Sequence, residues 1–395
     1  MLLVDNGAFF PEEADSLYRD KAWFLMDGMV LLGTDAVGMS EKELKYGRGW
    51  LLAQLKRSRL PMTNANVWDK QTKKTLLPPY LIIKKGAVTT GVFALTSDKV
   101  DLGPARDSLT FEEPAVAAAR VIPEMKKKGA TVIVLLSELG KVESEDLVTS
   151  VDGIDVVIAG RNVPVLQKGR MIKNTIACYG GEQGQNIGRT IVTLDASKKM
   201  QTGENDVFML SAEVGEKPSV LALVKSFNDD FNERLRKSIP PPEPPEPPEP
   251  LPVDHFVGAQ VCQRCHAAEF SQWLTTDHAK AWQTLVDAKR EATPECVICH
   301  VLGYRQAGGF EMAEDAPKPG NVQCENCHGM GTQHVAFPSG PRAKVAEETC
   351  RGCHNATSSP VFDFAVYEPH ILHHPPAVVP PLPPNPAKEK MKGAH

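Results

Sequence analysis

The first part of the chain alternates buried apolar runs with helical stretches. Residues 132–136 and 156–158 are runs of Val, Ile and Leu, the pattern of strands buried on both faces of a sheet. Residues 114–128 begin with a proline and end before a glycine, which predicts a helix. Such signals continue through residues 1–237, so we expect a layered α/β domain there.

Two further segments fit this pattern. Residues 81–83 and 90–95 are apolar and flank a Lys-Gly turn, which predicts a hairpin-like pair of strands. Near the end of the domain, apolar residues recur at helical spacing and mark one face of a helix: Val220, Val224, Phe227, Phe231 and Leu235.

Residues 253–374 follow a different pattern. They contain short helical stretches and frequent Gly and Pro, so their side chains alone could not build a large apolar core. A Pro/Glu run at 240–250 precedes them; it favours polyproline II and would span roughly 35–40 Å if extended. We therefore expect four parts: an α/β domain (1–237), a Pro/Glu linker (238–252), a mainly α domain (253–374) and a disordered Pro/Lys-rich tail (375–395).

One spacing, Cys-x-x-Cys-His, occurs four times in the helical part and uses eight of the nine cysteines. It is the attachment signature of c-type haem, in which two thiols bind the porphyrin covalently and the histidine ligates iron. Structural zinc is the alternative, but zinc does not require a histidine directly after the second cysteine. We expect four covalent haem c groups, held by Cys262, Cys265 and His266; Cys296, Cys299 and His300; Cys324, Cys327 and His328; and Cys350, Cys353 and His354. The ninth cysteine, Cys178, follows an apolar strand and reads as a buried small hydrophobe.

All 11 histidines lie at or after His255. A low-spin electron-transfer haem takes a second strong axial ligand. Enough histidines lie outside the motifs to give every haem a second histidine ligand, although the sequence does not require that every haem has one. These seven are His255, His278, His334, His370, His373, His374 and His395.

Charge and hydropathy exclude some classes of function. A net charge of −5 suggests no nucleic-acid partner. No apolar run reaches about 18 residues, so we expect no transmembrane helix. No signal peptide is visible, although c-type haem is attached outside the cytoplasm; we expect a periplasmic or extracellular protein whose true start lies upstream, or a processed or fragmentary chain.

The N-terminal part resembles the five-prime nucleotidase family of calcineurin-like metallophosphoesterases. The segment LLVDNGAFF at 2–10 resembles the family's LLVDAGDFF, VLLSELG at 134–140 resembles VLLSHLG, and GIDVVIAGRN at 153–162 resembles GIDVIIGGHSH. Residues 65–67 and 184–189 also follow the family order. The resemblance implies a dinuclear metal site that activates water for phosphate-ester cleavage.

The ligand positions of that site are replaced in this chain. Ala8 stands in place of the bridging aspartate, and Glu138, Arg161 and Val163 stand at histidine positions. Glu41 and Lys42 lie in the segment SEKELKYG, where the family has GNHEFDYG. The family's first strand would lie upstream of Met1. We therefore expect a metal-free domain without phosphoesterase activity.

A cavity that once held metal charge must be neutralised in another way, because buried charges without partners are costly. We predict that Lys42 or Arg161 pairs with Glu41, Glu138 or Asp5 at the former metal site. Collapse onto apolar packing around Val163 is the alternative.

The C-terminal part resembles the tetrahaem, cytochrome c-554-like family of ammonia oxidation. The resemblance rests on CQRCH at 262–266, SQW at 271–273, DHAKA at 277–281 and VQCENCHGMG at 322–331, in family order. It implies that His334 is the distal ligand of the His266 haem and His278 that of the His328 haem. The His354 haem would take His370, His373 or His374.

The resemblance also implies that the His300 haem is five-coordinate, unless His255 closes that position. We interpret the chain as an electron carrier that exchanges electrons with redox partner proteins, such as other cytochromes or an oxidoreductase. The phosphoesterase-like domain would then serve as a docking or spacing module. The alternative is reduction of a small ligand, such as a nitrogen oxide, at the open His300 haem.

Overall fold

The computed structural model describes residues 1–11, 16–182, 184–210, 214–238, 254–316, 318–339, 345–373, 379 and 381–382. The chain forms two compact units, Met1–Leu223 and Val224–His395. The Pro/Glu run and nearly all of the tail, with His374 and His395, lie outside the described residues.

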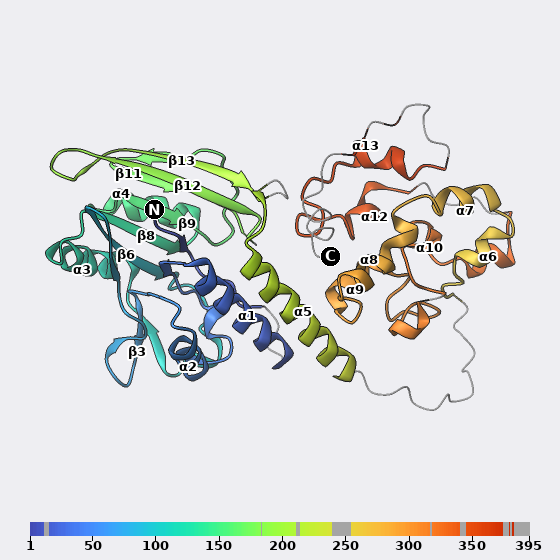
Figure 1. Cartoon of the computed structure of the whole chain (residues 1–395), viewed down its shortest axis with the longest axis horizontal. Coiled ribbons are helices and arrows are strands. Elements are labelled where there is room, and N and C mark those ends of the chain that lie inside the picture. The colour runs from blue at the N-terminus through green and yellow to red at the C-terminus, as the bar shows by residue number, and fades with distance from the viewer. Residues whose placement is uncertain are drawn as a thin grey trace. The chain divides into compact units, whose positions relative to one another are not determined.

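The first unit is built on a six-stranded sheet of order β10-β11-β9-β8-β6-β5 (Figure 1). Its four central strands are parallel, and β5 and β10 pair antiparallel at the two edges. The strands are β5 (Leu81–Lys85), β6 (Val88–Thr96), β8 (Val132–Glu138), β9 (Val156–Ala159), β10 (Arg170–Ile172) and β11 (Thr175–Cys178).

The centre of this sheet is buried on both faces. All seven residues of β8 are buried. Ile133 and Leu135 pack into one apolar cluster with helices α3 (Pro114–Lys127) and α4 (Lys141–Ser150). Val134 and Leu136 pack into a second cluster, which includes residues of a long hairpin, β12 (Asn186–Leu194) with β13 (Met200–Met209). A strand buried on both faces is uniformly apolar, which is why its sequence shows an unbroken run.

The remaining elements of the first unit are short strands and helices around a third apolar cluster. They are β1 (Val4–Asp5), α1 (Ser16–Leu32), β2 (Ala36–Val37), α2 (Arg48–Ser58), β3 (Val67–Asp69), β4 (Lys74–Thr75) and β7 (Leu109–Phe111). The strands predicted at 132–136 and 156–158, the hairpin and the helix at 114–128 are confirmed. The β12–β13 hairpin was not predicted, because its strands face solvent on one side and mix polar with apolar residues.

Helix α5 (Pro218–Ser238) contains the predicted helical face, with Phe231 and Leu235 buried. The boundary between the compact units falls inside this helix.

The second unit is helical, as expected, and no strand occurs among its described residues. Its apolar core cluster is small: Leu285, Val297, Val301 and Phe310. Its helices are α6 (Ala259–Gln263), α7 (Ala267–Trp273), α8 (Ala281–Asp287), α9 (Pro294–His300), α10 (Cys324–His328), α11 (Thr332–Ala336), α12 (Glu347–Arg351) and α13 (Phe364–Tyr367). In neither unit do the described helices include one with the length and apolar character needed to cross a bilayer.

Candidate functional sites

Each Cys-x-x-Cys-His motif lies on or directly after a short helix. The second and third motifs coincide with α9 and α10, the first begins in α6, and the fourth begins in α12. Residues three apart share one face of a helix, so the two thiols of a motif can reach the same flat macrocycle.

Three histidine rings lie opposite motif histidines at a uniform distance. The ring centroids are 6.1 Å apart for His266 and His334, and 6.1 Å apart for His354 and His278. The centroids of His328 and His373 are 6.2 Å apart. A metal between two imidazoles, with metal–nitrogen bonds of about 2.0 Å, puts the ring centroids roughly 6 Å apart. The described residues therefore fit three iron ions, each between two histidines.

Two of these pairings differ from the sequence-based expectation. His334 lies opposite His266, as the family resemblance implies. His278 lies opposite His354 rather than His328, and His373 lies opposite His328 rather than His354. The spacing of the motifs does not determine which helix packs against which, so the pairing could not be derived from the sequence.

His300 differs from the other motif histidines. No histidine ring packs against it among the described residues. Its Nδ1 lies 2.7 Å from the carbonyl oxygen of Ala281 and 3.2 Å from Thr284 Oγ1. A histidine whose Nδ1–H donates to a carbonyl presents Nε2 to a metal, and the bond fixes the orientation of the ring.

Hydrogen-bonding contacts at Nδ1 orient two other histidine rings in a similar way. The Nδ1 of His354 lies 3.2 Å from Ser359 Oγ, and that of His373 lies 3.2 Å from Gln272 Oε1. Burial lowers the pKa of His278, His300 and His354, which favours the neutral imidazole that binds metal. The Nε2 of His370 is buried, and no hydrogen-bond partner for it occurs in the described part of the chain.

Cysteines from different motifs lie close together. The side chains of Cys262 and Cys324 are within hydrogen-bonding reach, as are those of Cys299 and Cys353. The contact with Cys353 lowers the pKa of Cys299 to about 7.

A third proximity joins the two pairs. Burial, with a smaller contribution from nearby Cys350, raises the pKa of Cys327 to about 11. The third motif also lies beside the second, because Asn326 Nδ2 donates to the carbonyl oxygen of Val301 at 3.0 Å.

Glu325, inside the third motif, connects it to two other segments. Its buried carboxylate accepts hydrogen bonds from the backbone N–H of Val257 (3.1 Å), Gly258 (2.8 Å) and Gly331 (2.6 Å). The first two residues precede the first motif, and Gly331 precedes His334. One carboxylate thus fixes both segments that present the His266 and His334 rings. Sequence reasoning missed this role.

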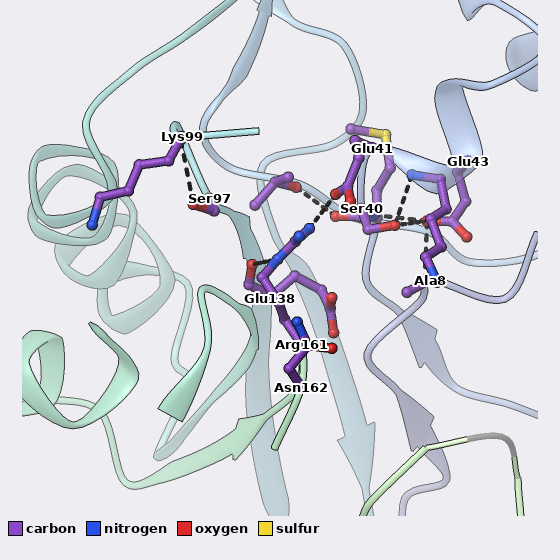
Figure 2. A network of polar contacts seen from close by, with 12 residues as sticks. Ala8, Ser40, Glu41, Glu43, Ser97, Lys99, Glu138, Arg161 and Asn162 are labelled. Atoms are coloured by element: carbon purple, nitrogen blue, oxygen red, sulfur yellow. Dashed lines mark hydrogen bonds and ion pairs between the residues drawn. The ribbon is translucent and has the colours of Figure 1, made fainter. Parts of the chain in front are cut away.

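In the first unit, the former metal-site positions form a polar cluster (Figure 2). Arg161 forms an ion pair with Glu41, and its Nε donates to the carbonyl oxygen of Glu138 at 3.0 Å. The predicted pairing of Arg161 with a nearby carboxylate is therefore confirmed. Val163 is buried in the neighbouring apolar cluster, so apolar packing accompanies the ion pair.

Glu43 organises the opposite side of the cluster. Its carboxylate is fully buried and accepts hydrogen bonds from the backbone N–H of Ala8 (3.1 Å), Phe9 (2.9 Å) and Ser40 (2.8 Å), and from Ser40 Oγ (2.8 Å). It holds the loop of Ala8 in place. The segment SEKELKYG keeps this Glu where the resembling family has GNHEFDYG, a signal that the sequence analysis did not use.

The backbone at the former ligand positions remains in an uncommon conformation. Ala8, Arg161 and Asn162 have φ angles of 59°, 65° and 54°. Residues other than glycine rarely adopt such angles, which cost energy and cluster at functional sites. Among the described residues, no group of three or more His, Cys, Asp or Glu side chains is arranged to hold a metal ion.

Glu138 is a second carboxyl of this cluster whose pKa is raised by burial, as that of Glu43 is. Burial, with repulsion from Glu43, raises its pKa to about 8, although Arg161 acts in the opposite direction. The side chain is protonated over most of the range between pH 5 and 8.

Comparisons with known proteins find similar proteins for both parts of the chain. Residues 261–329 match the family model for cytochrome c554 and c-prime. Cytochrome c-554 of Nitrosomonas europaea is 33% identical over 141 residues, which cover 27% of this chain and 60% of that protein.

The N-terminal region matches 5'-nucleotidases and related phosphoesterases. The 5'-nucleotidase of Vibrio cholerae is 23% identical over 257 residues, which cover 53% of this chain and 46% of that protein. The sulfate thiohydrolase SoxB of Thermus thermophilus superposes with a TM-score of 0.53 at 19% identity, over 59% of this chain and 43% of its own. A 5'-nucleotidase precursor from the same species gives 0.50 at 22% identity, over 60% and 50%.

At these identities the likeness shows the metallophosphoesterase fold alone. The chain spans between about half and three fifths of the length of the curated relatives named here. The cytochrome c554-like domain supports a role in haem electron transfer.

Proposed function

We propose that this chain is an exported electron carrier that holds four covalent haem c groups in its C-terminal domain, beyond the Pro/Glu linker. The observation that carries the proposal is the set of three histidine pairs with ring centroids 6.1–6.2 Å apart, each containing a motif histidine. When bound, haem supplies one-electron chemistry, and the chain tunes its potential through axial ligands, burial and hydrogen bonds.

The roles of the chain's own residues follow from the geometry. His334, His278 and His373 complete the coordination of sites whose motif histidines are His266, His354 and His328. The proximity of the first motif to the third, of the third to the fourth and of the fourth to the second supports electron exchange between these neighbouring sites. The hydrogen bond from Asn326 to the Val301 carbonyl adds the second motif as a neighbour of the third.

The test is haem quantitation by pyridine haemochrome together with intact mass and resting-state EPR. We expect four haems per chain, retained under denaturing conditions, with three low-spin centres and one high-spin centre. A colourless or zinc-loaded protein would refute the proposal.

A second function is supported by the surroundings of His300. Among the described residues, no histidine ring faces it, while its Nδ1 is anchored to Ala281. An open position at this site would bind, and could reduce, a small ligand such as nitric oxide. If the reduced protein shows only low-spin haem and binds no nitric oxide, this second function is rejected and the carrier function stands.

We further propose that the N-terminal domain is not an enzyme and serves as a docking module for a redox partner protein. The ion pair between Arg161 and Glu41 supports the absence of hydrolysis, because Arg161 stands where the resembling family has a metal-ligating histidine. Metal-dependent hydrolysis of nucleoside monophosphates by the purified chain would contradict it.

A further inference from the structure

We propose that the second half of α5 is a positioning element of the second haem motif, acting through the buried carboxylate of Glu291. This inference rests on the proposed function insofar as the motif binds haem. The helix precedes the Pro/Glu run in sequence and lies outside the matched residues 261–329. Even so, the structure assigns residues from Val224 onward to the second compact unit.

The contact is formed by one face of α5. Asn232 Nδ2 donates to Glu291 Oε2 at 3.0 Å, and the backbone N–H of Ala292 donates to Asn232 Oδ1 at 3.2 Å. Arg236, one turn further along the helix, forms an ion pair with the other oxygen of Glu291. We call these three side chains, Asn232, Arg236 and Glu291, the α5 clasp.

Burial separates this contact from an ordinary surface ion pair. Asn232 is 4% exposed and Glu291 is 6% exposed. A buried carboxylate without partners is costly, so both oxygens of Glu291 must be satisfied, and residues of α5 do this. Both cations are half exposed, so the difference from the rim pair of Lys289 with Asp229 lies in the carboxylates: that of Glu291 is 5% exposed and that of Asp229 is 38% exposed.

The clasp holds the loop that joins α8 to α9. This loop includes Lys289, which has a φ angle of 52°, and it ends at Thr293, directly before α9. The α8–α9 hairpin carries the whole second motif: α9 supplies the cysteines and His300, and α8 supplies the Ala281 carbonyl that orients the His300 ring.

A movement of the loop would therefore change the position of the His300 ring relative to its hydrogen-bond acceptor. The other motifs lie on different helices, α6, α10 and α12, and none of the contacts that hold Glu291 and Ala292 involves those helices. We conclude that the clasp acts on one haem site out of four, the one without a facing histidine.

The experiment uses the full-length holoprotein with a site-specific protease sequence placed inside the Pro/Glu run at 240–250. After cleavage, the fragment ending in α5 and the cytochrome fragment should co-elute in size-exclusion chromatography. The variant Arg236→Glu should weaken their association by at least roughly a hundredfold, because it puts a like charge beside the buried carboxylate of Glu291. The matched control is Lys237→Glu, which makes the same charge change one residue further on, where Lys237 forms only an exposed pair with Glu233.

A second readout follows the haem site itself. In uncleaved Arg236→Glu, the kinetics of carbon monoxide binding to the reduced protein should change several-fold in the high-spin haem, with the low-spin spectra unaltered. Arg236→Lys should restore the wild-type behaviour. The inference is overturned if the wild-type fragments separate, if the Arg236→Glu fragments remain together, or if the high-spin haem is insensitive to the variant. Absence of covalent haem would refute the proposed function instead, while fragment association would still report on the clasp.

Discussion

Replacing Glu138 by glutamine should stabilise the phosphoesterase-like unit at high pH and leave its stability unchanged at low pH. Glu138 is buried, and its pKa in the folded protein is raised from 4.5 to about 8. A group with a raised folded pKa binds more protons in the folded state, so it contributes stability below its unfolded pKa and loses it as pH rises. The stability contributed by protonated Glu138 is therefore lost between about pH 4.5 and about pH 8.

The magnitude follows from the size of the shift. Each pKa unit corresponds to about 1.4 kcal/mol, so ionisation of Glu138 costs the folded state about 5 kcal/mol above pH 8. Glutamine keeps the size and shape of the side chain but cannot ionise. The free energy of unfolding of Glu138→Gln should match the wild type at pH 4 and exceed it by up to about 5 kcal/mol at pH 9.

Urea unfolding at pH 4, 7 and 9, followed by tryptophan fluorescence, measures this difference, because Trp23, Trp50 and Trp68 lie in the first unit. Glu143→Gln is the control, because it should change the free energy of unfolding at high pH in the opposite direction. A backbone hydrogen bond and the ion pair with Lys99 lower the pKa of Glu143, so its replacement should remove stability at high pH. A stability difference for Glu138→Gln that is constant from pH 4 to pH 9 would refute the reasoning.

Three further outcomes are expected. His278→Ala should convert the haem attached at Cys350 and Cys353 from low-spin to high-spin without releasing it, and an EPR change at the His328 site instead would reject the pairing seen here. Arg161→Leu should lower the free energy of unfolding by about 1–3 kcal/mol, because it leaves the half-buried Glu41 without its cation. Urea titration measures this loss, and adding Glu41→Gln to the same chain should recover part of it. The wild-type protein should hydrolyse no nucleoside monophosphate with Mg²⁺, Mn²⁺ or Zn²⁺, as followed by phosphate release, and sustained turnover would show that the former centre still functions.

Much of the first unit could be predicted from sequence, because its central strands are buried on both faces and read as unbroken apolar runs. The run at 132–136 lies inside β8, all of whose side chains are buried. The β12–β13 hairpin escaped prediction because its pairing depends on a partner strand rather than on local periodicity. The Arg161–Glu41 ion pair could be predicted, since charges at a former metal site require compensation.

In the second unit, the sequence identifies the attachment residues but not the partners of their histidines. His278 is separated from His354 by 76 residues, and no local pattern distinguishes His354 from His328 as its partner. The role of Asn232 was equally hidden. Its contact with Glu291 joins residues on either side of the Pro/Glu run, and only tertiary packing brings them together.

Two side chains inside the third motif reach the neighbourhoods of two other motifs. Asn326 Nδ2 donates to the carbonyl oxygen of Val301 at 3.0 Å, directly after His300. Glu325 accepts from the backbone N–H groups of Val257 and Gly258, just before the first motif. The third motif is therefore a hub of the cytochrome unit, and a substitution at Asn326 or Glu325 is felt at a haem site other than its own.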